Sequence, residues 1–379
     1  MKATTVQALS QTASAGGILS APSLRTKRVP SPHDEGVGRG PGRGVSRKAF
    51  SPHGYSLHEP LSPALSPLVP RGARETAGGA TWGCQHTAPA SAEKSWLAVY
   101  ADLFKARLTS LVLLTTLVGF YLGFRGPVDF VLMFHLLLGT ALLASGAAAL
   151  NQLLEREYDA KMRRTQDRPL PSGRLQPSTV LMVGCASALV GLLFLAQAVN
   201  LTTSLVGGTS LVCYLFVYTP LKRMTWLNTL VGAVPGALPP LIGWTAARGE
   251  LSSEGLALFA IQAFWQLPHF MAIAWIYREE YARAGFKMLP LVDPDGRRTS
   301  HQAVSYTLAL LAVSLCPFLF NLTGPIYLGG ALVLGLAFVW FAFQFARERT
   351  VTRARQLFYA SLLYLPLLLA VMVLDKVKP

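Results

Sequence analysis

The chain has 379 residues, of which 51% are hydrophobic and only 14% are charged, and its formal net charge is +15. Ordinary soluble domains carry about 25% charged residues, so this composition excludes an average soluble protein and favours a membrane protein. The positive charge does not indicate nucleic-acid binding, because the basic residues flank apolar segments and form no basic helix or aromatic-rich sheet.

Residues 1–92 contain no long apolar run and carry ten Lys or Arg against four Asp or Glu. A basic, Ser-rich segment that is poor in acids is typical of an organelle-targeting presequence, and a secretory signal would need an apolar core. We therefore predict a mitochondrial presequence over residues 1–92 and a location in the inner mitochondrial membrane. A disordered segment is the alternative, because the segment also contains ten prolines.

Nine apolar segments follow, each close to the length that crosses a bilayer core of about 30 Å. They predict an all-α membrane domain of nine transmembrane helices over residues 93–379. The expected spans are 106–123, 130–152, 178–197, 202–219, 226–246, 254–276, 302–320, 325–345 and 355–374.

The distribution of Lys and Arg supports nine spans. With nine spans, one side of the membrane holds the amino-terminal flank and the loops near 153–177, 220–225, 277–301 and 346–354. That side carries 20 of the 24 Lys and Arg that follow residue 92. This asymmetry agrees with the positive-inside rule. The long polar loops thus share one face, which favours an enzyme over a channel. If the presequence is real, that face is the matrix face.

The end of the second span carries an oxygen-bearing side chain at every fourth position, namely Asn151, Glu155 and Asp159. Residues four apart lie on one face of a helix, so these side chains would form a stripe. Such ligands suit Mg²⁺, which binds one or two carboxylates together with substrate phosphates and waters.

Basic side chains follow this stripe directly, at Lys161, Arg163, Arg164 and Arg168. Guanidinium groups pair well with phosphate oxygens, so the two features together predict a metal–diphosphate site. The alternative is an ordinary charged loop, in which acid–base pairs support the helix and the arginines set the orientation in the membrane.

The stretch NQLLEREYDAKMRRTQDRPLPSGRL resembles the first signature of the UbiA-type intramembrane prenyltransferases, Asn-x3-Asp-x3-Asp followed by Arg-Thr-x2-Arg-Pro-Leu, with Glu155 at the middle acid. Residues 218–244 and 265–292 resemble the haem-prenylating branch of that family, and the resemblance runs from about residue 95 to the end. It implies the UbiA-type nine-helix bundle. It also implies transfer of the farnesyl group of farnesyl diphosphate to a vinyl group of haem B, giving haem O for the haem A of cytochrome c oxidase.

The resemblance further implies roles for single residues. Asn151, Glu155 and Asp159 would be the catalytic group that holds Mg²⁺. Diphosphate binding would fall to Lys161, Arg164, Arg168, Tyr218 and Lys222, and further cavity candidates are Asn228, Glu280, Tyr281 and Lys287.

His269 lies within an apolar span, where a neutral imidazole needs a hydrogen-bond partner. Imidazole is also a common axial ligand of haem iron. Because the implied substrate is haem, we predict that His269 positions it. A core histidine whose hydrogen bonds are satisfied is the alternative.

Two other functions remain as alternatives. A relative that prenylates a quinone-ring precursor is expected to carry a second Asp-x3-Asp repeat in the third stretch, where this chain has Glu280 and Tyr281. A secondary transporter would show broken helices at matched positions, whereas only residues 232–240 are rich in Gly and Pro. The expected partners are farnesyl diphosphate, haem B, the bilayer and the next enzyme of haem A formation, with no nucleic acid.

Overall fold

The computed structural model describes residues 94–377, so the predicted presequence and its boundary at residue 92 lie outside the described residues. Nine helices of the described part are long and apolar enough to cross a membrane. They are α2 (Ala106–Gly123), α3 (Phe130–Asp159), α4 (Pro177–Ala198), the composite helix of α5 (Leu201–Val212), η1 (Cys213–Tyr218) and α6 (Thr219–Met224), α7 (Asn228–Arg248), α8 (Ser253–Ile276), α11 (Arg297–Val313) with α12 (Cys316–Leu319), α13 (Pro325–Glu348) and α14 (Val351–Leu374).

The nine predicted spans are confirmed, and the main difference is at the end of the second one. Helix α3 continues to Asp159, seven residues beyond the predicted boundary at 152, so the charged residues after the apolar span are also helical. Three short helices were not predicted: α1 (Trp96–Leu103), α9 (Arg278–Ala284) and α10 (Leu289–Val292).

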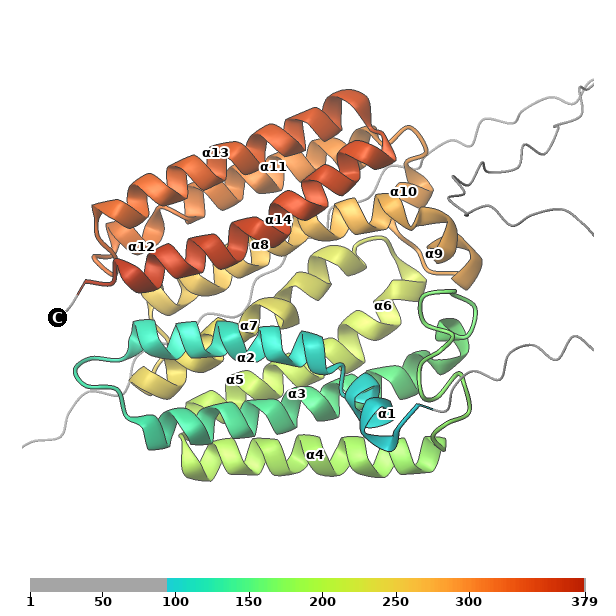
Figure 1. The fold of residues 1–379 in the computed structure, drawn as a ribbon, viewed down its shortest axis with the longest axis horizontal. Helices are drawn as coiled ribbons and strands as arrows, with labels where there is room; N and C mark the ends of the chain where they lie inside the picture. The colour runs from blue at the N-terminus through green and yellow to red at the C-terminus, as the bar shows by residue number, and fades with distance from the viewer. Residues whose placement is uncertain (1–93, 378–379) are drawn as a thin grey trace, which may run out of the picture. The chain divides into compact units, whose positions relative to one another are not determined.

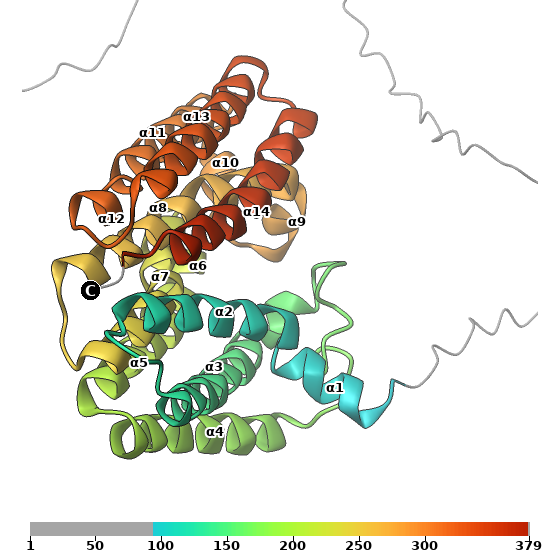
Figure 2. The same ribbon diagram turned by 60° about the vertical axis from the view of Figure 1, so that its left-hand side comes forward.

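The spanning helices lie lengthwise beside one another, with α4 and α13 at opposite edges and α7 between them (Figures 1 and 2). In an apolar stretch of 18 residues of α7, 72% of the residues are buried inside the bundle, against 28% in the corresponding stretches of α4 and α13. Helix α7 therefore forms the centre of the bundle, and the outer helices turn apolar side chains toward lipid.

Glycines allow neighbouring helices to approach closely. A Cβ added at Gly243 of α7 would clash with the backbone of Thr116 in α2, and one added at Gly146 of α3 would lie 2.6 Å from the backbone nitrogen of Ala188 in α4. Close backbone approach at small residues is the usual way in which helices pack inside a membrane.

The short helices α1, α6, α9 and α10 and the loop after α3 gather at one end of the bundle (Figure 1). The predicted clustering of the long polar loops is confirmed by this arrangement. An apolar cluster ties the loop after α3 to the α9–α10 segment: Met162 packs with Ala284, Phe286 and Met288. The two loops that carry most of the charge are thereby held against each other.

Candidate active site

Asn151, Glu155 and Asp159 lie on one buried face of α3, as the spacing predicts. Their exposed fractions are 1%, 4% and 1%. Ionised carboxylates are very costly to bury unless a cation or hydrogen-bond donors accompany them. The stripe therefore requires basic partners from other elements.

Each carboxylate has such a partner. Lys222 of α6 lies with its Nζ 2.7 Å from Glu155 Oε1, and Arg168 of the loop after α3 lies with its Nη1 2.6 Å from Asp159 Oδ2. Both ion pairs are largely shielded, since the side chains of Glu155 and Asp159 are 5% and 1% exposed. The two pairs join three chain segments at the loop-rich end of the bundle.

Local hydrogen bonds explain how the partners reach α3. Thr165 Oγ1 donates to the carbonyl of Asp159 at 2.8 Å, which turns the loop back on the helix and brings Arg168 alongside. In α6, the Lys222 ammonium lies 4.5 Å from the centre of the Tyr218 ring, a cation–π contact. The carbonyl of Lys222 accepts from the backbone N–H of Lys287 at 2.8 Å, which fixes α6 against the α9–α10 segment.

Lys105 is a member of the cluster that the sequence did not reveal. Its Nζ donates to Asn151 Oδ1 at 2.9 Å and lies 3.5 Å from the Tyr214 hydroxyl, while Asn151 Nδ2 donates to Thr219 Oγ1 at 3.1 Å. Burial of the Lys105 ammonium lowers its pKa to about 7. In the sequence Lys105 is one of several basic residues flanking the first span.

The turn between α1 and α2 places Lys105. The residue has a φ of 48°, in the left-handed region that few residues other than glycine adopt. Gln152 Nε2 donates to the carbonyl of Leu103 at 2.7 Å, which anchors this turn to α3 beside Asn151.

The resulting cluster holds two carboxylates against the cations Arg168 and Lys222 and the titratable Lys105, with the cation Arg164 near its edge. Arg164 Nη2 donates to the Tyr281 hydroxyl at 3.3 Å, which links the loop after α3 to α9. The excess positive charge suits an anionic ligand. The side-chain oxygens on α3 suit a hard divalent metal ion, which would take its remaining ligands from that anion and from water.

No group of three or more His, Cys, Asp or Glu that could hold a metal by itself occurs in residues 94–377. The stripe supplies only two carboxylates and one amide oxygen. Mg²⁺ commonly binds through one or two carboxylates plus substrate phosphates, so the residues fit a metal that arrives together with a diphosphate.

The other predicted residues lie outside this network of contacts. Asn228 Nδ2 donates to the carbonyls of Thr225 and Lys287, at 2.7 and 2.6 Å, and so holds the start of α7. The Lys161 ammonium lies 5.3 Å from the centre of the Tyr158 ring. The side chains of Glu280 and Lys287 make no described hydrogen bond or ion pair, and their roles stay predictions.

His269 lies on α8 against α14. Its Nδ1 is 2.7 Å from Ser361 Oγ, and its ring stacks on Trp265 at a centroid distance of 5.2 Å. One ring nitrogen thus has a partner within the protein, as the alternative interpretation requires. The other nitrogen has no described bond, so a role toward haem stays a prediction.

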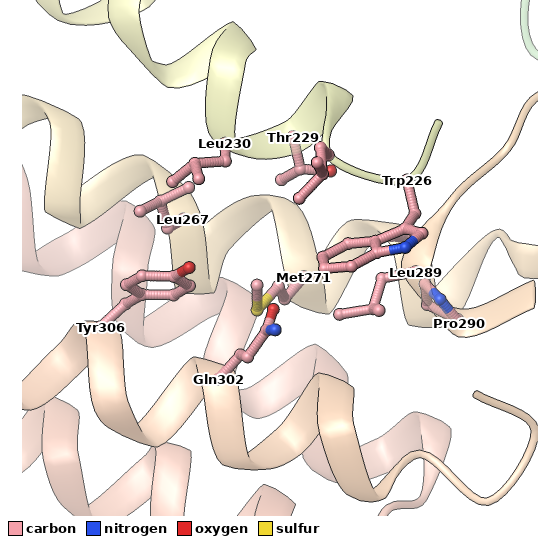
Figure 3. Close-up of a pocket in the computed structure, with 11 residues that line it drawn as sticks. Trp226, Thr229, Leu230, Leu267, Met271, Leu289, Pro290, Gln302 and Tyr306 are labelled. Carbon is pink, nitrogen blue, oxygen red and sulfur yellow. The ribbon is translucent and has the colours of Figure 1, made fainter. Parts of the chain in front are cut away.

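Figure 3 shows a different hollow, between the start of α7 and helices α8, α10 and α11. Leu230, Leu267 and Met271 form much of its wall, with Gln302 and Tyr306 as polar members. It contains none of the predicted site residues, so the charge cluster on α3 is the better candidate for the chemistry.

Comparison with known proteins identifies a family and a shared fold. Residues 112–365 match the UbiA prenyltransferase family. A protein named protoheme IX farnesyltransferase from Solibacter usitatus is 49% identical over 286 residues, which cover 73% of this chain and 98% of the relative. The mitochondrial protein of that name from Arabidopsis thaliana is 40% identical over 281 residues, which cover 74% of this chain and 65% of the relative.

Solved structures share the fold at low sequence identity. A structure of digeranylgeranylglyceryl phosphate synthase has a TM-score of 0.65 at 14% identity and covers 75% of this chain and 99% of its own. A UbiA homologue from Archaeoglobus fulgidus, bound to DMAPP and Mg²⁺, has a TM-score of 0.53 at 18% identity and covers 72% of this chain and 98% of its own.

Proposed function

The chain belongs to the UbiA prenyltransferase family, and we propose that it transfers the farnesyl group of farnesyl diphosphate to a vinyl group of protohaem IX, haem B, giving haem O. It is a membrane-embedded prenyltransferase of nine spanning helices, counted over residues 94–377. The observation that carries the mechanism is the buried stripe of Asn151, Glu155 and Asp159 with cations converging on it from three other segments.

The stripe would hold Mg²⁺, through the carboxylates of Glu155 and Asp159 and the amide oxygen of Asn151. The bound ion would neutralise part of the negative charge of the diphosphate and so make it a better leaving group. Lys222 and Arg168 now pair with these carboxylates, and a competing divalent ion would free both cations to turn toward the diphosphate.

Cations fixed where negative charge develops stabilise the transition state without further reorganisation. We assign this role to Lys105, Arg168 and Lys222, with Arg164 at the edge of the cluster. The turn before α2, the loop after α3 and helix α6 hold these side chains beside the stripe, so Arg168 and Lys222 need only turn from the carboxylates toward the diphosphate when it binds with the metal. Lys161 and Tyr218 remain weaker candidates for diphosphate contacts.

The transfer then involves three bond changes. The bond between the allylic carbon and the diphosphate oxygen breaks, and the diphosphate leaves with the electron pair. The vinyl carbon of haem B attacks the allylic cation, and water captures the carbocation that results, losing a proton to give the hydroxyl of haem O. Apolar and aromatic walls, such as Phe286 beside Lys222, would exclude water until the carbon–carbon bond has formed.

The proposed reaction is tested by its product. Membranes that contain the full chain, incubated with haem B and farnesyl diphosphate, should yield an extracted haem whose mass has increased by one farnesyl group and one hydroxyl group. Membranes lacking the chain provide the control. Farnesylation of an added aromatic acid with no change in haem would identify a quinone-directed enzyme, and movement of a solute without any product would indicate a transporter.

His269 is expected to act on haem alone. Replacing His269 by Leu should raise KM for haem B about tenfold, the equivalent of one lost contact, with KM for farnesyl diphosphate unchanged. Ser361→Ala removes only the partner of Nδ1 and serves as the matched control. Equal effects of the two substitutions on both substrates would assign His269 a packing role.

We also propose that the protein lies in the inner mitochondrial membrane with its loop-rich end in the matrix, where haem O would pass to the next enzyme of haem A formation. Support comes from the basic segment over residues 1–92 and from the 20 of 24 Lys and Arg assigned to that end. A soluble reporter fused to residues 1–92 should enter mitochondria and be shortened. Retention of the uncut fusion in the cytosol would contradict this assignment.

A further inference from the structure

A groove on the outside of the bundle carries charges that the proposed reaction does not use. Residues at the end of α3, the start of α4 and α6 line it, and we call it the outer groove. Its walls include Leu154, Arg156, Glu157 and Tyr158 from α3, Ser178 and Leu181 from α4, and Arg223 from α6. Glu155 and Asp159 of the same helical end are buried and do not line it.

Arg223 is the innermost cation of the outer groove. Its guanidinium lies 4.0 Å from the centre of the Tyr158 ring, and its Nη2 donates to the carbonyl of Leu154 at 2.9 Å. Its Nε is buried and has no hydrogen-bond partner among residues 94–377. A buried guanidinium N–H without an acceptor is costly, so this atom indicates a missing acceptor.

Arg156 supplies a second guanidinium at the edge of the groove. Its side chain is 47% exposed, and its only described ion pair, with Glu157, is 3.8 Å long. Glu157 itself is 76% exposed and is well solvated, so this pair contributes little. The guanidinium N–H groups of Arg156 can therefore donate hydrogen bonds to an anion.

The first turn of α4 adds a third attraction for negative charge. This 22-residue helix begins at Pro177, and Gln176 before it makes no side-chain capping bond. Unpaired N–H groups and the helix dipole favour an anion at such an end. Ser178 of the same turn also lines the groove.

The remaining wall of the outer groove is apolar and faces outward. Leu154 and Leu181 are 47% and 48% exposed, and in an apolar stretch of 18 residues of α4 only 28% of the residues are buried. In a spanning helix such exposed leucines meet lipid. Guanidinium groups beside lipid-facing leucines at the end of a span suit a phosphate that is attached to an acyl chain.

From this combination we propose that the outer groove binds an anionic phospholipid. The phosphate lies against Arg156, Arg223 and the first turn of α4, and an acyl chain runs along Leu154 and Leu181. The lipid links the end of α3 to α6 from outside the bundle. The site is separate from the proposed transfer reaction, because none of its ligands belongs to the charge cluster.

Native mass spectrometry of the full chain, purified in detergent, tests the site with dioleoylphosphatidylglycerol and dioleoylphosphatidylcholine as probes. The anionic lipid should bind the wild-type chain at least about fivefold more tightly than the zwitterionic one, the factor expected for one basic residue at a membrane surface. Equal affinities for the two lipids would overturn the proposal.

Variants locate the site. Ser178→Asp places a carboxylate in the groove, yet an acid in the first turn of a helix favours the helix, so the fold is preserved. This variant and Arg156→Gln should each weaken binding of the anionic lipid by about fivefold or more. Arg355→Gln removes an exposed charge at the start of α14 and should leave binding unchanged.

Three results would contradict the assignment. An equal loss in Arg355→Gln would show that the attraction is general to the basic end of the bundle. Displacement of the anionic lipid by millimolar inorganic phosphate would identify a site for free phosphate instead of lipid. Retained affinity in Ser178→Asp would exclude the outer groove altogether.

Discussion

Replacing Asp159 by Asn is expected to lower kcat by at least about 10²-fold, the loss typical of removing one group that stabilises charge in a transition state. The amide keeps the size of the side chain and removes the charge that pairs with Arg168 at 2.6 Å. It also removes one of the two carboxylates proposed to hold Mg²⁺. The initial rate of haem O formation, measured over a range of Mg²⁺ concentrations with purified protein, provides the test.

Asp167→Asn is the matched control, because Asp167 belongs to the loop that follows Asp159, is exposed and makes no described ion pair. Its turnover should equal that of the wild type. Both variants should accumulate in the membrane, which immunoblotting of membrane fractions checks. Full turnover of Asp159→Asn at low Mg²⁺ would refute the metal assignment, and Asp159→Ala should be as inactive as the Asn variant.

The parts of the structure that could be predicted are those set by local sequence. Hydropathy identified the nine spans because each segment must by itself match the thickness of a bilayer. The placement of Asn151, Glu155 and Asp159 on one face of a helix was predictable because helical periodicity depends only on neighbours four residues apart. The burial of that face was not predicted. The distribution of Lys and Arg correctly predicted that the polar loops lie at one end of the bundle. This prediction was possible because the charge of each loop can be counted from its own residues.

Two partners of the stripe come from distant segments, and their contacts with it could not be predicted from the residues alone, whereas Arg168 is only nine residues from Asp159. Lys105 lies 46 residues before Asn151, and its role depends on a left-handed turn and on the contact of Gln152 with Leu103. In the sequence it looked like an ordinary flanking lysine. Nothing in the order of residues indicated that Glu155 would pair with Lys222, 67 residues away.

Replacing Lys222 by Gln is expected to have two separate effects. Loss of the cation that we propose to contact the diphosphate should lower kcat by about 10²-fold. It should also leave the Glu155 carboxylate, 5% exposed, without its partner, and breaking a buried ion pair in this way costs about 3–5 kcal/mol. The protein should therefore melt at a clearly lower temperature in detergent, which a thermal unfolding scan measures.

The double variant Glu155→Gln with Lys222→Gln separates these effects. Two neutral amides at 155 and 222 leave no unpaired charge, and replacing both members of a buried pair is often neutral for stability. The melting temperature should therefore return toward the wild-type value, while turnover stays at the level of the Lys222 variant or below. Such a result would mean that the charges at these positions serve the reaction. If turnover instead recovered together with the melting temperature, the pair would have only a structural role, and Asp159, Arg168 and Lys105 would have to support the departure of the diphosphate without it.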